Sequence, residues 1–222
     1  MRHRHLAAAL AAASLAAPLA ALAQSAAAPS VTTGQTWTYR TINDYNRLPL
    51  GEVTSQVTGT GDGIRVMVRG GNAEQSARLA RPGALAEGPL NDRARGTFSP
   101  ALDVLPFPLE PGKRWSQTVQ RRDAVTGELR EVHVDGRVVG WETVRVPAGE
   151  FRALRVERRM RLGDWDQFRG ETWRAETEWF VPEVGGPVKL TVFEEYGERR
   201  YSLWSFMPGE RLTYELTGWK KG

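Results

Sequence analysis

Apolar and polar residues alternate with a period of two along much of the chain. Residues 36–40 read TWTYR and residues 64–69 read IRVMVR, so large apolar side chains recur at every second position. Because successive side chains of a strand point to opposite faces, this pattern is typical of strands that are buried on one side. Turn-forming residues separate the alternating segments, as in residues 59–63 (GTGDG). The pattern therefore predicts consecutive strands joined by tight turns.

The clearest pair of strands flanks the polar loop 163–171. Residues 154–162 carry an apolar face that Arg158 interrupts, and residues 173–181 carry Trp173 and Trp179 on one face. We expect these tryptophans to point inward, with Glu176 and Glu178 on the opposite, solvated face. On that face the two glutamates would form cross-strand ion pairs with arginines of the first strand, namely Arg155, Arg159 and Arg161.

Further strands are predicted at residues 188–196 and 211–217, and no long amphipathic helix is evident. Residues 72–81 suit either a helix or a polar strand, and residues 82–105 contain too many prolines and glycines to be assigned. The predicted fold class is mainly β: an antiparallel curved sheet or an incomplete or closed β-barrel with little helix.

The N-terminal residues predict export. A basic start at residues 2–5 precedes a short run rich in alanine and leucine, and residues 21–23 (ALA) form a cleavage site. We therefore expect residues 1–23 to be a signal peptide, residues 24–31 a short linker and residues 32–222 a single β domain. No cysteine is available for lipid attachment, and no later segment is apolar for long enough to span a membrane. A periplasmic location is predicted, with full secretion as the alternative.

Composition excludes several function classes. The first 23 residues hold two of the 30 basic residues and none of the 26 acidic ones, so the rest has a formal charge of +2 and no nucleic-acid partner is expected. His133 is the histidine that remains, and cysteine is absent, so a zinc site of His and Cys ligands is excluded. Dinucleotide and phosphate-binding glycine motifs are also absent, and no cofactor is predicted. We interpret His133 as an ordinary strand residue.

Two pairs of acidic residues could form chemical sites. Glu176 and Glu178 could in principle serve glycoside hydrolysis, but neighbouring arginines favour a charged outer face. Asp164 and Asp166 form a D-x-D in the loop beside Trp165, yet no further liganding pattern lies nearby. No catalytic residue and no metal site are predicted.

Eight tryptophans are unusual for a chain of this length. They suit either the packing of a large β core or a concave face that holds an apolar or sugar-like ligand. Two of the few lysines could meet an anionic head group, although solvated lysines beside turns are more common. The candidate binding residues are Trp165, Trp173, Trp179, Lys113 and Lys189.

Three segments occur in an order that resembles the TapB-like family of exported bacterial proteins, which is related to a bacterial domain of unknown function. They are FPLEPGKRW (107–115), VPAGEFRALRVE (146–157) and WFVPEVGGPVKL (179–190). The resemblance covers roughly residues 32–218 and implies a β-rich envelope protein, without catalytic residues. Residues 42–105 match no known pattern, and Gly186-Pro187 departs from the shorter apolar link expected there.

Three functions remain open. The leading hypothesis is a non-enzymatic envelope module that binds an apolar or lipid-like ligand. The alternatives are an envelope interaction or scaffold protein with a protein partner, and a carbohydrate-active enzyme that uses acidic residues.

Overall fold

The computed structural model describes residues 25–200 and 203–222, with side chains described for residues 25–198 and 205–222. The predicted signal peptide, residues 1–23, lies outside the described residues. No helix in the described part of the chain is long and apolar enough to cross a membrane.

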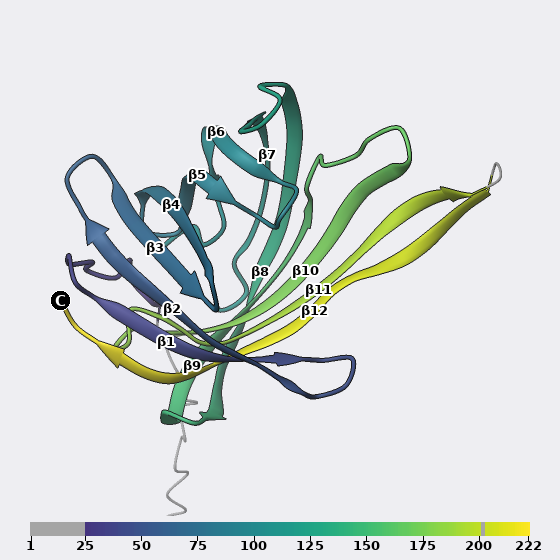
Figure 1. The fold of residues 1–222 in the computed structure, drawn as a ribbon. Helices are drawn as coiled ribbons and strands as arrows, with labels where there is room; N and C mark the ends of the chain where they lie inside the picture. The colour runs from purple at the N-terminus through teal and green to yellow at the C-terminus, as the bar shows by residue number, and fades with distance from the viewer. Residues whose placement is uncertain (1–24, 201–202) are drawn as a thin grey trace, which may run out of the picture.

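The described chain folds into strands alone, and each strand pairs with its neighbours in sequence (Figure 1). All pairings are antiparallel, and β1 also pairs with β12, which closes the sheet into a barrel. The mainly β fold class is confirmed, in its closed form. The strands are β1 (Thr36–Asn43), β2 (Pro49–Gly59), β3 (Ile64–Gly70), β4 (Ala73–Arg81), β5 (Ala84–Pro89), β6 (Arg95–Asp103), β7 (Arg114–Asp123), β8 (Leu129–Val146), β9 (Gly149–Arg161), β10 (Arg169–Val181), β11 (Gly186–Arg200) and β12 (Leu203–Lys220).

The alternating segments of the first half form strands as predicted. Trp37 and Tyr39 of β1 are buried, while Arg40 between the inward positions is exposed. In the turn between β2 and β3, Gly63 adopts a φ of 77°, a conformation that glycine takes without steric cost. A Cβ at this position would lie 2.5 Å from the carbonyl oxygen of Leu79. The glycine-rich segment therefore serves as a hairpin turn.

Residues 72–81, for which the sequence allows either a helix or a polar strand, form a strand. These residues form β4, and the unassigned stretch that follows contains β5 and β6. Register shifts interrupt the pairing of β5 with both of its neighbours. Such irregular pairing breaks the period of two, which explains why the sequence pattern gave no strand there.

The expected orientation of β10 is wrong. Glu176 pairs directly with Arg158 of β9, and Glu178 pairs with Val156, so the two glutamates face the lumen. Trp173, in contrast, is 46% exposed. Since the side-chain period of a strand is two, a register change of one residue moves every side chain to the other face. The glutamates consequently meet Arg158 inside the barrel, rather than Arg155, Arg159 and Arg161 outside it.

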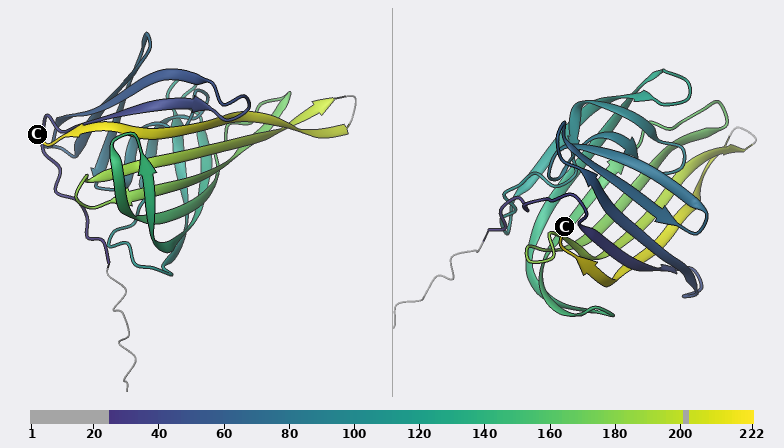
Figure 2. Two further views of the ribbon diagram at one scale, coloured as in Figure 1. Left: turned by 90° about the horizontal axis from the view of Figure 1, so that it is seen from below. Right: turned by 60° about the vertical axis from the view of Figure 1, so that its left-hand side comes forward.

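The interior divides into three hydrophobic clusters. One lies around Phe98, Val132 and Met160, a second around Leu109, Leu154 and Phe180, and a third around Trp37, Val188 and Leu216. The long β8–β9 hairpin contributes Ala153 to the third cluster, and its turn donates a hydrogen bond from the Ala148 amide to the Leu216 carbonyl (2.9 Å). The hairpin thereby packs against β12 at one end of the barrel (Figure 2).

The segment before β1 packs against the barrel instead of hanging free. Ala26 is buried and exchanges two backbone hydrogen bonds of 2.8 Å with Leu109. The last residue, Gly222, lies beside Gly34, so the end of β12 packs against the segment that leads into β1. Residues 25–31, which were predicted to form a linker, are thus part of the packed structure.

Candidate functional site: an apolar lumenal cavity

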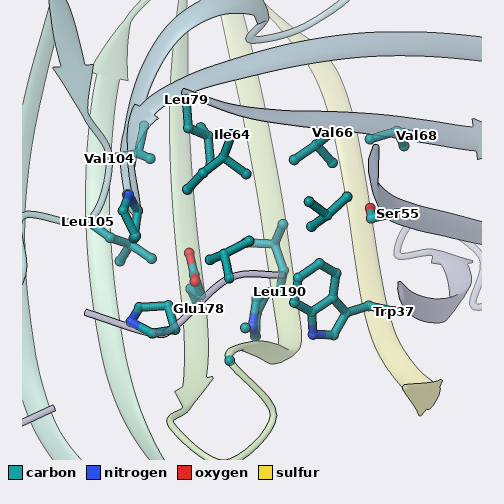
Figure 3. Close-up of a pocket in the computed structure, with 18 of the residues that line it drawn as sticks. Trp37, Ser55, Ile64, Val66, Val68, Leu79, Val104, Leu105, Glu178 and Leu190 are labelled. Carbon is teal, nitrogen blue, oxygen red and sulfur yellow. The ribbon is translucent and has the colours of Figure 1, made fainter. Parts of the chain in front are cut away.

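A cavity of about 580 Å³ occupies the part of the lumen beneath β1–β4 (Figure 3). Its walls come from inward positions of successive strands, since the lining residues on β2 and β3 are spaced two apart. Loops complete the wall at Gly83 and Leu105, and Pro29 and Val31 of the N-terminal segment close part of it. Apolar lining side chains include Trp37, Val53, Val57, Ile64, Val66, Val68, Leu79, Val104, Leu105, Phe107, Phe180 and Leu190.

Two aromatic side chains of the cavity lining are hydrogen-bonded to the backbone. The indole nitrogen of Trp37 donates to the Val184 carbonyl (3.0 Å), and the Tyr39 hydroxyl donates to the Pro187 carbonyl (2.9 Å). Gly186 lies against the ring of Trp37, where a Cβ would come within 3.0 Å of the indole nitrogen. The two aromatic side chains are therefore fixed in place, and their ring surfaces remain available to a ligand.

A buried ion-pair network reaches the cavity through one of its members, Glu178. Arg158 donates from Nε to Glu176 (2.5 Å) and from an NH1 group to Glu178 (2.6 Å). Arg174 donates to the other oxygen of Glu176 (2.6 Å) and to Glu194 (2.6 Å). The side chains of the two arginines and of the three glutamates are at most 11% exposed. The network therefore runs along the inner face of three neighbouring strands, from β9 through β10 to β11.

The electrostatics of this network keep its charges in place. Burial alone would raise the pKa of Glu176, but the guanidinium groups of Arg158 and Arg174 outweigh burial and lower that pKa to about 2. Burial likewise opposes the charge of Arg174, yet Glu176 and Glu194 raise its pKa. Burial, and then the charge of Glu178, raise the pKa of Tyr39 well above its ordinary value. The site therefore holds an ionised Glu176 and a neutral phenol.

The three candidate tryptophans are absent from the lining of the cavity. Trp165 is 55% exposed in the loop before β10, with the Arg130 guanidinium 4.2 Å from its ring centroid. Trp173 faces outward near Arg161. The indole nitrogen of Trp179 donates to a carboxylate oxygen of Glu142. The inward orientation predicted for Trp173 and Trp179 is thus wrong, and their role in binding stays a prediction.

The two candidate lysines also lie outside the cavity lining. The Lys113 ammonium donates to the carbonyl oxygens of Pro106 and Pro108 (2.7 Å to the latter), which ties it to the segment between β6 and β7. Lys189 forms an ion pair with Glu215 at 3.3 Å and lies over the ring of Trp179. Both ammonium groups already have partners within the protein.

His133 has more partners than the sequence suggested. Its Nδ1 lies 2.8 Å from the Thr118 hydroxyl, and its Nε2 lies 2.9 Å from Asp135. This hydroxyl, imidazole and carboxylate resemble the order of a hydrolytic triad. They lie, however, on the outer face of β7 and β8, and neither Thr118 nor His133 lines a described cavity. The arrangement fits a polar patch on the outer sheet.

The D-x-D pair in the loop before β10 is used structurally. Asp164 is buried and accepts hydrogen bonds from the Thr172 amide (2.6 Å) and hydroxyl (2.7 Å). Asp166 accepts from the amides of Phe168 and Arg169, which forms a local turn. Among the described residues, no group of His, Cys, Asp and Glu side chains could hold a metal ion.

Sequence reasoning missed the residues that line the cavity, although it placed several of them on strands. Trp37, Tyr39, Ile64, Val66 and Val68 were recognised as inward-facing positions. A signal for the cavity is the modest size of the inward side chains on β2 and β3, which are mostly valine and which fill less of the lumen than larger side chains would. Glu178 was recognised in the sequence but assigned to the outer face, and Arg158 within an apolar face indicates only that some buried partner is needed, without saying which.

Comparisons with known proteins find two similar solved structures but no family that the chain matches. No family model matches the chain, and no curated protein matches it. The fold is similar to a candidate lipoprotein from Parabacteroides distasonis (13% identity, TM-score 0.46, 89% of this chain and 100% of the other covered). It is also similar to a candidate exported protein with a YmcC-like fold from Bacteroides fragilis (15% identity, TM-score 0.42, 88% and 100% covered). Neither likeness is close enough to carry an argument, and membership of the TapB-like family stays a prediction.

Proposed function

We propose that this chain is an exported envelope protein that binds an apolar or lipid-like molecule inside its barrel. The observation that carries the proposal is the cavity of about 580 Å³, whose lining is predominantly apolar. Ligand sites of proteins commonly measure about 300–1,000 Å³ and combine apolar walls with a few polar groups. Export itself rests on the basic and apolar pattern of residues 1–23. The periplasm is the proposed location.

The geometry does not favour glycoside hydrolysis by Glu176 and Glu178. A general acid for this reaction needs a carboxyl group whose pKa is raised toward neutrality. Arg158 and Arg174 instead hold the pKa of Glu176 at about 2 against the effect of burial. Arg158 also donates a hydrogen bond to Glu178, so both carboxyl groups are engaged by arginine.

A role in protein contacts is a second candidate, favoured by exposed aromatic side chains. Phe168 is 70% exposed and Phe206 is 72% exposed. Phe206 lies on the outer part of the β11–β12 hairpin, which extends beyond the barrel (Figures 1 and 2). Exposed apolar side chains that gather into a contiguous patch are typical of interaction surfaces.

The binding proposal is tested by filling the cavity from one wall. Val66 lines the cavity, whereas Met67 on the same strand points to the outer face. We expect Val66→Trp to reduce the affinity for a fluorescent twelve-carbon probe at least about tenfold, because the added ring takes up ligand volume. The matched control Met67→Trp should bind the probe like the unmodified protein. Native mass spectrometry of protein purified from a periplasm should also show a retained, solvent-extractable molecule. Equal binding by both variants would place the ligand elsewhere.

A further inference from the structure

Among the described residues that line the cavity, Glu178 is the single charged one. It enters from β10, and its side chain is only 5% exposed. Figure 3 shows its carboxylate pointing into the space between Leu105 and Leu190. A carboxylate in such surroundings is costly to bury unless hydrogen bonds satisfy it. Any oxygen of Glu178 that lacks a hydrogen-bond donor from the protein therefore indicates a donor that the ligand must supply.

Only one oxygen of Glu178 has a partner within the described chain. Oε2 accepts the hydrogen bond from Arg158, and no donor of the described residues bonds Oε1. Tyr39 is the nearby hydroxyl whose electrostatics are influenced by Glu178, but it donates its proton to Pro187. Oε1 is thus an acceptor that faces the cavity without a protein donor.

The charges of the network do not cancel. Arg158 and Arg174 supply two positive charges to Glu176, Glu178 and Glu194, which leaves one negative charge in excess. Glu210 lies 3.7 Å from Arg174 and adds a further carboxylate at a more exposed position. A positive charge placed beside Oε1 would balance this excess.

We propose that the ligand of this cavity is an apolar molecule that carries a hydrogen-bond donor, with an ammonium group preferred, and that this donor bonds Oε1 of Glu178. The inference rests on the proposed function and names its ligand class. Long-chain amines have the required chemistry, and long-chain alcohols have it without the charge. A carboxylate head group would be repelled by Glu178, so free fatty acids are disfavoured at this position.

The test compares three probes with the same twelve-carbon chain: dodecylamine, dodecanol and dodecanoate. Their affinities for the unmodified protein are measured by displacement of a fluorescent apolar probe at pH 7.5, where a primary amine is protonated and a carboxylic acid is ionised. We expect dodecylamine to bind at least about tenfold more tightly than dodecanoate, with dodecanol between them, because hydrogen bonds to charged groups are the stronger kind.

Glu178→Gln then tests the contact itself. The amide keeps an oxygen that can accept from Arg158 and presents an NH₂ group in place of Oε1. We expect the preference for dodecylamine over dodecanol to disappear and dodecanoate to gain affinity. Glu157→Gln is the matched control, because it removes the same charge from the outer face of β9, where Glu157 pairs with Arg137 and Arg155. The control should bind the three probes with the same order of affinities as the unmodified protein.

The outcomes separate the two proposals. Equal affinity for all three probes would overturn the assignment of the head group and leave the apolar binding site in place. Tighter binding of dodecanoate would overturn it as well. If none of the probes binds, the proposed function itself is wrong. The series on the unmodified protein decides these points even if Glu178→Gln does not fold.

Discussion

At the scale of single residues, the unusual feature of this barrel is a charged side chain at the centre of an apolar strand face. Arg158 occupies an inward position between Val156 and Met160, and both of these neighbours are fully buried. Charges removed from water are retained only when strong hydrogen bonds replace their hydration. The two glutamates of β10 provide those bonds. The network therefore couples the stability of the barrel to the protonation of its carboxylates.

Acid should destabilise the protein through Glu176. Its pKa is lowered from 4.5 to about 2 in the folded state, because Arg158 and Arg174 outweigh burial. The stability it contributes is fully present above the unfolded value and is lost as the pH falls through the folded value. The difference corresponds to on the order of 3 kcal/mol. Chemical denaturation should show this loss between pH 4.5 and pH 2.

Comparison with Glu176→Gln isolates the effect. The variant is less stable at pH 7, since two arginines lose an ionised partner, but it lacks the titrating group. Its unfolding free energy should change less than that of the unmodified protein across the same pH range. Glu150→Gln, at the exposed start of β9, removes an equal charge and serves as control. If the unfolding free energy of Glu176→Gln depended on pH as steeply as that of the unmodified protein, the acid sensitivity would not come from Glu176.

At the scale of strands, the pairing of β7 with β8 shows how a large ring is accommodated in the lumen. Trp115 lies directly opposite Gly136, and its indole nitrogen donates to the Asp103 carbonyl (3.0 Å). A Cβ at Gly136 would come within 2.1 Å of the ring. The glycine therefore leaves the space that the tryptophan fills, an arrangement in which an aromatic ring covers a strand glycine.

Gly136→Ala should destabilise the barrel. The ring of Trp115 is held by its hydrogen bond, so the added methyl group forces a shift of side chain or backbone that costs about 1–3 kcal/mol. Gly218→Ala in β12 is the control, because no atom lies within 4 Å of a Cβ at that position. Urea denaturation should show a lower midpoint for Gly136→Ala, whereas the midpoint of Gly218→Ala should stay unchanged. Equal midpoints would mean that the ring of Trp115 moves aside without cost.

How far the sequence predicts these strands depends on how regular each strand is. β1, β3 and β9 have a clear apolar face, and their alternation gave both the strand and the inward side. On β10 the inward face carries Arg174, Glu176 and Glu178, while the outer face carries aromatic residues. The hydrophobic pattern of β10 therefore predicts that its aromatic face points inward, which is the opposite of its orientation in the structure. Only the register with β9, which is a tertiary property, reveals that Arg158 makes a charged lumenal face possible.

The candidate site was less predictable than the fold for a related reason. A cavity is defined by what the lining side chains leave empty, and a sequence pattern reports only which way they point. Their size makes tryptophans candidates for either core packing or ligand contact, but Trp165 and Trp173 lie on the outer surface beside arginines. Smaller residues such as Val66 and Val68 form the wall instead.

At the scale of the whole molecule, the closed sheet leaves its ends as the routes into the lumen. Every described strand is paired on both sides, so the wall offers no open edge to a ligand. The N-terminal segment lies across one end, where Pro29 and Val31 line the cavity and Ala26 is bonded to Leu109. Access to the cavity at this end should therefore depend on whether the segment stays in place.

Ala26→Glu should release this segment without unfolding the barrel. Ala26 is 2% exposed within an apolar cluster, so a carboxylate there would cost several kcal/mol, and detaching a short terminal segment avoids that cost. Ala27→Glu is the matched control, because the neighbouring side chain is exposed. With Pro29 and Val31 displaced, the bound twelve-carbon probe should dissociate about tenfold faster from Ala26→Glu alone, as measured by stopped-flow displacement. Hydrogen exchange should show faster exchange at Ala26 while the strand amides stay protected. Equal dissociation rates in a variant whose segment has detached would show that the ligand leaves by another route.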